Sequence, residues 1–168
     1  MEDCGGWVGI LFALPRGMSA VNLVPKKILV STDFSEASDY AVKYAVGLAK
    51  QLGASLVLLH AYEIPLLTLP GSAAALAPEI VQKIVTASED ALRERAAGLR
   101  DSGVPIETML KTGDARQTIV AVASFIHADL IVMGTHGRTG LSRVLIGSVA
   151  ENVVRTATVP VLTVKPPA

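Results

Sequence analysis

Short apolar runs alternate with longer amphipathic stretches along most of this chain. The runs are nearly continuous in apolar and β-branched residues, a pattern typical of strands buried on both faces of a sheet. They predict strands at Lys27–Ser31, Ser55–His60, Val104–Leu110, Leu130–Met133 and Val159–Val164.

The stretches between these runs repeat their apolar residues at helical spacing. The predicted helices run from a Ser35 cap to Gly53, from Pro78 to about Arg100, from an Asp114 cap to about Ile126, and from a Ser148 cap to about Thr156. Serine and aspartate side chains accept hydrogen bonds from the first backbone N–H groups of a helix, and proline suits the first turn.

The predicted helix after Pro78 carries the apolar residues Ile80, Ile84, Ala91 and Leu99, which we expect to face the core. Prolines and a glycine interrupt any period in the preceding stretch, Tyr62–Ala77. We therefore expect that stretch to be a loop.

The alternation of strand and helix predicts an α/β fold: a single doubly wound, five-stranded parallel sheet flanked by helices, in a Rossmann-like architecture. Ligands of such sheets bind outside the carboxyl ends of the strands, where the strand order reverses. Asp33, Ala61 and Gly134 each lie just past the end of a predicted strand. We therefore expect these residues to converge on one crevice.

Composition narrows the class of protein. Of the 168 residues, 51% are hydrophobic and 18% are charged, which is typical of one globular domain and not of a disordered chain. Fifteen basic residues balance fifteen acidic ones, so no excess charge points to nucleic acid or to an anionic membrane as a partner. The lone cysteine, Cys4, excludes an internal disulfide and a cysteine-based metal cluster, which fits a cytoplasmic protein.

The first two dozen residues differ from the rest of the chain. Their apolar run, Trp7–Leu14, is far too short to cross a bilayer, and the acidic Glu2 and Asp3 precede it where a signal peptide would be basic. We expect residues 1–24 to form an N-terminal extension outside the core fold, and residues 25–168 to form the domain. Met18 begins the segment that leads into the first strand and is a candidate for the true start of the protein.

The most informative segment is the glycine-rich stretch Val132–Ser148, which links a predicted strand to a predicted helix. Glycines let the main chain approach a phosphate closely, and the N–H groups at the start of a helix point at the anion. We interpret the stretch as a nucleotide-phosphate site. It is not a Walker A loop, because it lacks Gly-Lys-Ser/Thr, and it does not follow the first strand as the dinucleotide fingerprint does.

Several segments together resemble the universal stress protein family, specifically its ATP-binding branch. The first strand and turn (Lys26–Ser35), the second strand end (Leu58–Ala61) and the last strand (Pro160–Val164) are similar to those of the family. The spacing Gly134-x2-Gly137-x9-Gly147-Ser148 resembles the pattern by which ATP-binding members are recognised. The resemblance covers about residues 26–165 and implies an adenine nucleotide alpha hydrolase-like fold.

The resemblance also implies where an adenine nucleotide would lie. Asp33 and Ala61 would hold the adenine and ribose, and the glycines and serine of the spaced pattern would hold the phosphates. The full set of candidate nucleotide-binding residues is Ser31, Thr32, Asp33, Ala61, Met133, Gly134, Thr135, His136, Gly137, Arg138, Gly147, Ser148 and Val149. The nucleotide would be ATP or another adenine nucleotide, with Mg²⁺ bridging its phosphates.

The family resemblance further implies a homodimer paired through the last strand, Val159–Val164. A bare strand edge would otherwise invite aggregation. Simpler roles remain open for some loop residues: Arg138, Arg143 and His136 would either touch a phosphate or point into solvent. Likewise, the apolar segment Leu66–Leu76 would be a lid over the ligand, a surface for a partner, or a stretch packed on the domain's own helices.

The function expected from the sequence is that of a cytoplasmic ATP-binding universal stress protein whose nucleotide state changes its shape or partners. One alternative is an enzyme with slow ATP hydrolysis or autophosphorylation. The other is a nucleotide-independent, dimeric interaction protein. The glycine-rich loop contains no carboxylate that could act as a general base, which favours binding over rapid turnover.

Overall fold

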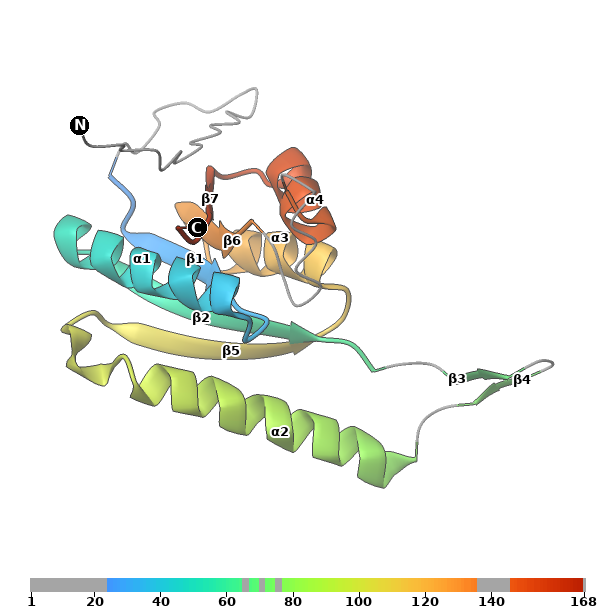
Figure 1. Cartoon of the computed structure of the whole chain (residues 1–168). Helices are drawn as coiled ribbons and strands as arrows, with labels where there is room; N and C mark the ends of the chain where they lie inside the picture. The colour runs from blue at the N-terminus through green and yellow to red at the C-terminus, as the bar shows by residue number, and fades with distance from the viewer. Residues whose placement is uncertain (1–23, 65–66, 70–71, 75–76, 136–145, 168) are drawn as a thin grey trace.

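The computed structural model describes residues 24–64, 67–69, 72–74, 77–135 and 146–167. In chain order these residues form β1 (Lys27–Ser31), α1 (Glu36–Leu52), β2 (Ser55–Tyr62), β3 (Leu67–Leu69), β4 (Ser72–Ala74), α2 (Pro78–Ala97), the 3-10 turn η1 (Arg100–Ser102), β5 (Ile106–Thr112), α3 (Ala115–Phe125), β6 (Leu130–Gly134), α4 (Ser148–Thr156) and β7 (Val161–Val164). Apart from the short strands β3 and β4, strands and helices alternate as the sequence predicts (Figure 1).

A five-stranded sheet in the order β5-β2-β1-β6-β7 forms the centre of the molecule, and all of its pairings are parallel. The fold class predicted from the sequence is therefore confirmed. From β1 the chain moves outward through β2 to β5, then returns to β6 on the other side of β1. The strand order thus reverses between β1 and β6, the kind of point at which ligands of such sheets bind.

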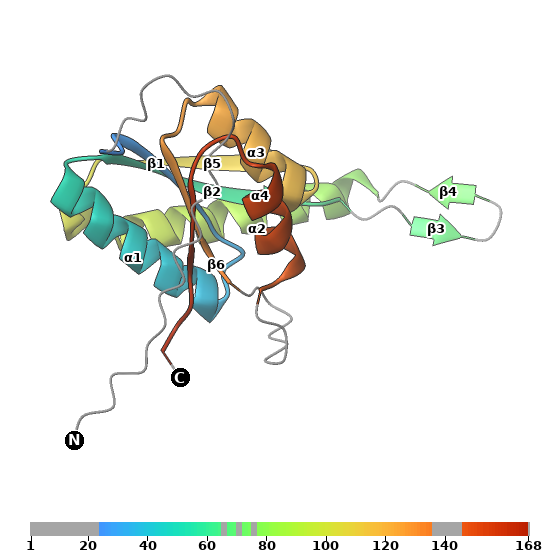
Figure 2. The same ribbon diagram turned by 90° about the horizontal axis from the view of Figure 1, so that it is seen from above.

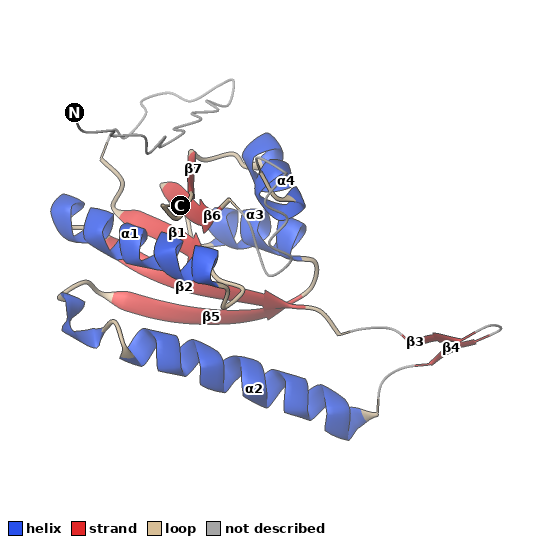
Figure 3. Ribbon diagram, in the orientation of Figure 1, coloured by secondary structure: helices blue, strands red, loops and turns tan. Residues whose placement is uncertain are grey.

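Helices cover both faces of the sheet (Figure 3). The sheet residues Ile28 and Val30 are fully buried in one cluster with residues of α1 and α2. Their neighbours Leu29 and Ile131 are fully buried in a second cluster, with residues of α3 and α4. Successive residues of a strand point to opposite faces, so each central strand needs apolar side chains at every position.

Three helix ends follow the capping chemistry expected from the sequence. The Ser35 side-chain oxygen accepts a hydrogen bond from the Ser38 backbone N–H at 3.3 Å and caps α1. Gly53 ends α1 with a φ of 61°, a left-handed conformation that glycine adopts without strain. Asp114 caps α3 by accepting a hydrogen bond from the Arg116 backbone N–H at 2.8 Å.

The prediction that Ser148 caps α4 is wrong. The N-cap is Gly147, whose backbone is extended (φ −70°, ψ 156°), and Ser148 is the first helical residue. Glycine serves at an N-cap because it adopts the required backbone at little cost. The Ser148 N–H therefore belongs to the first turn, whose N–H groups have no acceptor within the helix.

The sequence predicted that Tyr62–Ala77 is a loop, but the stretch also contains strand residues. β2 continues to Tyr62, and β3 and β4 pair as an antiparallel hairpin in which Thr68 lies opposite Ala73. Figures 1 and 2 both show this hairpin well away from the five-stranded sheet. Pro70 and Gly71 separate the two short strands in the sequence and lie outside the described residues.

α2 also departs from the prediction. It ends at Ala97, short of the predicted Arg100, and β5 begins at Ile106 instead of Val104. Leu92 is the only buried side chain of α2. Ile80, which we expected to face the core, is 47% exposed. The physical reason is that α2 packs against β5 and β2, at the edge of the sheet, so most of its surface has nothing to cover.

Some sequence predictions fall on residues outside the described ranges. These are the N-terminal extension up to residue 23, the loop residues His136, Gly137, Arg138 and Arg143, and parts of the segment Leu66–Leu76. Within the described ranges, no helix is both long and apolar enough to cross a membrane.

Candidate functional site

A cavity of about 340 Å³ lies at the carboxyl ends of the central strands. Its walls come from the ends of β1, β2 and β6 and from the sides of α1, α3 and α4 that face them. The lining residues are Ser31, Thr32, Asp33, Ser38, Ala61, Ala115, Ile119, Met133, Gly134, Thr135, Gly147, Ser148, Val149 and Ala150.

Every candidate residue that lies within the described ranges lines this cavity. His136, Gly137 and Arg138 lie outside those ranges. The structure therefore brings together residues that the sequence separates by more than a hundred positions, in the crevice expected from the strand ends.

Sequence reasoning missed four lining residues: Ser38, Ala115, Ile119 and Ala150. Ala115 lies shortly after the observed end of β5 at Thr112, but the predicted strand ended at Leu110, so the rule that selected Asp33 did not reach it. Ile119 lies one helical turn beyond Ala115, on the same face of α3. For Ser38 and Ala150, which are small residues within helices, the sequence carried no comparable signal.

The turn after β1 is held by its own side chains. The Thr32 backbone N–H donates to the Leu59 carbonyl at 2.9 Å, and the Thr32 hydroxyl accepts from the Phe34 N–H at 3.0 Å. That hydroxyl also lies 3.1 Å from the hydroxyl of Ser38 on α1. Phe34 has a φ of 63°, which non-glycine residues rarely adopt, so the turn needs these hydrogen bonds. They fix Asp33, which lies between Thr32 and Phe34.

The Asp33 carboxylate is oriented by Ser35. Its Oδ1 accepts hydrogen bonds from the Ser35 backbone N–H at 3.1 Å and from the Ser35 hydroxyl at 2.5 Å. Asp33 is half-buried and is the only carboxylate in the described lining of the cavity. A carboxylate offers lone pairs to several donors at once, so this group suits the hydroxyls of a sugar.

His60 supports the same turn from β2. It is 8% exposed, its Nδ1 lies 2.7 Å from the Thr32 carbonyl oxygen, and its ring centroid lies 4.3 Å from that of Phe34. Because a carbonyl only accepts hydrogen bonds, Nδ1 must carry the hydrogen. His60 thus ties β2 to the residue before Asp33 without itself lining the cavity.

The opposite wall is built from backbone. The Thr135 N–H donates to the Val164 carbonyl at 3.0 Å, and the Thr135 carbonyl accepts from the Gly147 N–H at 2.6 Å. The start of α4 is thereby held against the end of β6, and its first turn, beginning at Ser148, lines the cavity. The N–H groups of a helix N-terminus attract anions, and Gly134 has no side chain to keep one away.

An ion pair lies at the start of α3. The Arg116 Nε lies 3.0 Å from both carboxylate oxygens of Asp114. This side-chain hydrogen bond lowers the pKa of Asp114 to about 2, and the carboxylate raises the pKa of Arg116. Both groups are therefore charged at neutral pH, and they balance each other beside the cavity wall.

The described residues hold no group of three or more His, Cys, Asp or Glu side chains placed to bind a metal ion. A divalent cation at the cavity would therefore depend mainly on oxygen atoms of a bound ligand and on water, a mode that Mg²⁺ often uses.

The fold and cavity together define an α/β protein with a helix N-terminus lining a cavity at the switch point of a parallel sheet. The chain belongs to the universal stress protein family, whose family model matches residues 25–165. Among curated proteins, it is 38% identical over 144 residues to Universal stress protein MJ0531 of Methanocaldococcus jannaschii, a match that covers 84% of this chain and 83% of the relative.

Solved structures are also similar to this chain. The structure of MJ0577, from the same organism, superposes with a TM-score of 0.73 at 27% identity and covers 87% of this chain and 99% of that one. A universal stress protein in complex with cAMP superposes with a TM-score of 0.59 at 29% identity and covers 84% and 98% of the two chains.

Proposed function

We propose that this protein binds an adenine nucleotide in the cavity at the carboxyl ends of β1 and β6, and that ATP is the first candidate for this nucleotide. Its nucleotide state would then control its shape or its partners during stress. The observation that carries the proposal is that the described candidate residues all line one cavity at the switch point of the sheet. Further support comes from the similar universal stress protein in complex with cAMP.

The chemistry of the cavity walls suggests how the nucleotide would be oriented. The phosphates would lie at the first turn of α4, where Ser148 offers both its hydroxyl and its N–H because Gly147 is the cap. The ribose hydroxyls would donate to Asp33. Apolar side chains of Ile119 and Met133 on the other walls suit the face of a base.

A Mg²⁺ ion fits this arrangement as a bridge between phosphates. The lining supplies one carboxylate, Asp33, together with hydroxyls, which is too few for an all-protein cage. Mg²⁺ commonly takes its remaining ligands from phosphate oxygens and water.

We also propose that two copies pair through β7 and that the dimer works in the cytoplasm. β7 ends the strand order, so one of its edges has no neighbour in the described sheet. Pairing would remove an exposed edge that otherwise invites aggregation. The cytoplasmic location is supported by the lone cysteine, Cys4, because thiols stay reduced there.

The variant Gly147→Glu tests the position of the phosphates. A carboxylate placed beside the first turn of α4 would fill the space of an anion and repel it. By isothermal titration with ATP, in the presence and absence of Mg²⁺, we expect wild type to bind and Gly147→Glu to show no measurable binding.

Gly47→Glu is the matched control. It adds the same charge on α1, at an exposed position where a new side chain meets nothing within 4 Å. We expect it to bind ATP as wild type does. Normal ATP binding by Gly147→Glu would contradict the proposed phosphate position, and equal loss in both variants would mean that charge alone, not position, explains the effect.

A further inference from the structure

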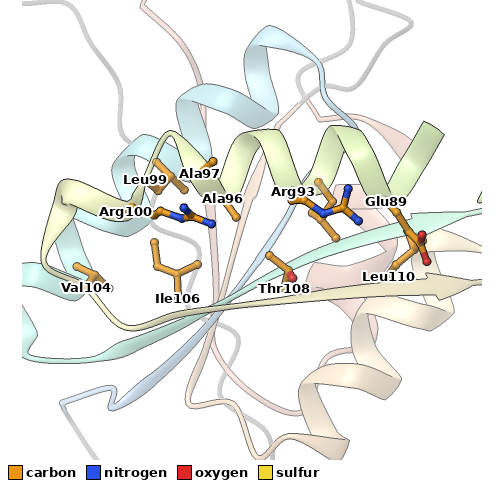
Figure 4. A pocket seen from close by; sticks show the side chains of 11 residues that line it. Glu89, Arg93, Ala96, Ala97, Leu99, Arg100, Val104, Ile106, Thr108 and Leu110 are labelled. Carbon is orange, nitrogen blue, oxygen red and sulfur yellow. The ribbon is translucent and has the colours of Figure 1, made fainter. Parts of the chain in front are cut away.

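A second and larger cavity lies between α2 and β5, on the outer edge of the sheet. Its volume is about 650 Å³, within the range of sites for small molecules. It shares no lining residue with the cavity at the carboxyl ends of the strands. Figure 4 shows side chains from the helix and from the strand facing each other across it. The proposed nucleotide site does not account for this space.

The lining mixes polar and apolar side chains, and its apolar part, which we call the floor, includes Leu92, Ile106 and Leu110. Leu92, the one buried residue of α2, faces Ile106 and Leu110 of β5, which are only half-buried. Where a helix packs on a sheet, such side chains normally close over one another and leave few voids. Here Ile106 and Leu110 pack against the cluster that contains Leu92 but stay half-buried beside the cavity, so an apolar body in the cavity would remove their remaining exposed surface from water.

Two arginines lie over that floor. Figure 4 shows the side chains of Arg93 and Arg100 along α2, with Thr108 on β5 at a position along the cavity between the two. Arg93 already pairs with Asp90 at 2.6 Å, in an ion pair that is largely exposed. Arg100 makes no ion pair among the residues that the structure describes, so its guanidinium has donors to offer. Glu89 lies at the other end of the cavity, beside Leu110.

We propose that this cavity is a second binding site, for an anionic amphiphile: a small molecule with one carboxylate-like head and an apolar body. The head binds Arg100, with the Thr108 hydroxyl as a second donor, because guanidinium groups pair with carboxylates in a matched geometry. The body lies along Leu92 and Leu110, towards Glu89. Glu89 at the far end disfavours a second negative charge there, which selects a ligand with a single anionic end.

Decanoate is the probe that tests the site. It carries one carboxylate on an unbranched apolar chain and is used below the concentration at which it forms micelles. In ¹H-¹⁵N NMR spectra of the full chain, we expect decanoate to shift the signals of α2, η1 and β5 and to leave the first turn of α4 unchanged. Decyltrimethylammonium, with the same chain and the opposite charge, is expected to produce no such shifts.

Two pairs of variants separate the head contact from the body contact. Arg100→Gln is expected to weaken decanoate binding by about tenfold, because one charged hydrogen bond is lost. Its control, Lys83→Gln, removes an exposed charge of α2 outside the cavity and should leave the affinity unchanged. Ala96→Phe should fill the cavity and abolish decanoate binding. Its control, Ala87→Phe, adds the same ring to an exposed position of the same helix and should leave decanoate binding unchanged.

The wild-type NMR titration decides the question even if Ala96→Phe folds poorly. Shifts that are confined to the residues around the cavity, and that need about tenfold more decanoate in Arg100→Gln, support the proposal. No shifts with decanoate, shifts spread over unrelated surfaces, or equal binding of decyltrimethylammonium would overturn it. None of these results bears on ATP binding, which takes place at a cavity with a separate lining.

Discussion

At the scale of single residues, the position of Asp33 depends on side chains that never reach the cavity. His60 donates a hydrogen bond to the Thr32 carbonyl and packs on Phe34, whose left-handed backbone needs support. A sequence shows His60 only as a polar residue at the end of an apolar run. Its partner, the Thr32 carbonyl, lies in the turn after β1 and becomes visible only in the structure.

His60→Phe should destabilise the protein. The ring keeps its volume but loses the donor, and the buried Thr32 carbonyl is left without that partner, at a cost of about 1–3 kcal/mol. His60→Asn keeps an N–H near the position of Nδ1 and should recover part of the loss. Urea unfolding measures both free energies. A His60→Phe variant as stable as wild type would show that the hydrogen bond does not support the turn.

Asp114 gives a prediction for pH. Its pKa is lowered to about 2 by the hydrogen bond from Arg116, below the ordinary value of 3.8. A lowered folded-state pKa contributes stability above the unfolded pKa and loses it as the pH falls from about 4 towards 2. NMR titration of the Asp114 carboxyl should show the low pKa in wild type and a value near the ordinary one in Arg116→Gln. An unchanged pKa in that variant would rule out Arg116 as the cause.

At the scale of elements, the sequence predicts what depends on local pattern and misses what depends on neighbours. The strands β1, β2 and β6 were recognisable because burial on both faces makes them apolar throughout. The same reasoning placed Asp33 and Gly134 at strand ends, and therefore near each other.

The misses have a common origin in tertiary packing. Apolar periodicity showed that α2 is a helix but not that it lies over the edge of the sheet, so Ile80 was expected to be buried and is not. For the same reason Ile119 of α3 could not be assigned to the cavity, since nothing local tells which side of the sheet a helix will cover. The predicted N-cap of α4, Ser148, was wrong by one residue, because Gly147 adopts the backbone conformation that an N-cap requires.

The shallow packing of α2 predicts its dynamics. α2 has one buried side chain, Leu92, whereas α1 has five buried residues. We therefore expect α2 to unfold locally more readily than α1. Hydrogen exchange is therefore expected to be faster in α2. Leu92→Ala should increase exchange in α2 further and leave α1 unchanged, whereas Ile80→Ala, at an exposed position, should have little effect. Equal protection of the two helices in wild type would contradict this picture.

At the scale of the whole molecule, the proposed dimer is tested at the free edge of β7. The carbonyls of Pro160 and Val164 accept from β6, so by alternation the N–H of Thr163 points away from the sheet. Thr163→Pro removes that outward N–H and no hydrogen bond to β6. It should therefore leave the fold intact and block strand pairing between copies.

Light scattering coupled to size exclusion measures the outcome. We expect wild type and Thr163→Val, which keeps the N–H, to have the mass of two chains, and Thr163→Pro to have the mass of one. A folded Thr163→Pro variant that remains dimeric would place the interface elsewhere.

The central claim, that an adenine nucleotide occupies the cavity between the ends of β1 and β6, is tested most directly on freshly purified protein. The protein is denatured, and any released nucleotide is identified by chromatography and mass spectrometry, with Gly147→Glu prepared in parallel. ATP or ADP released near stoichiometrically from wild type and not from Gly147→Glu is the predicted result. Wild type that releases no nucleotide and also fails to bind added ATP would contradict the claim and favour a nucleotide-independent, dimeric interaction protein.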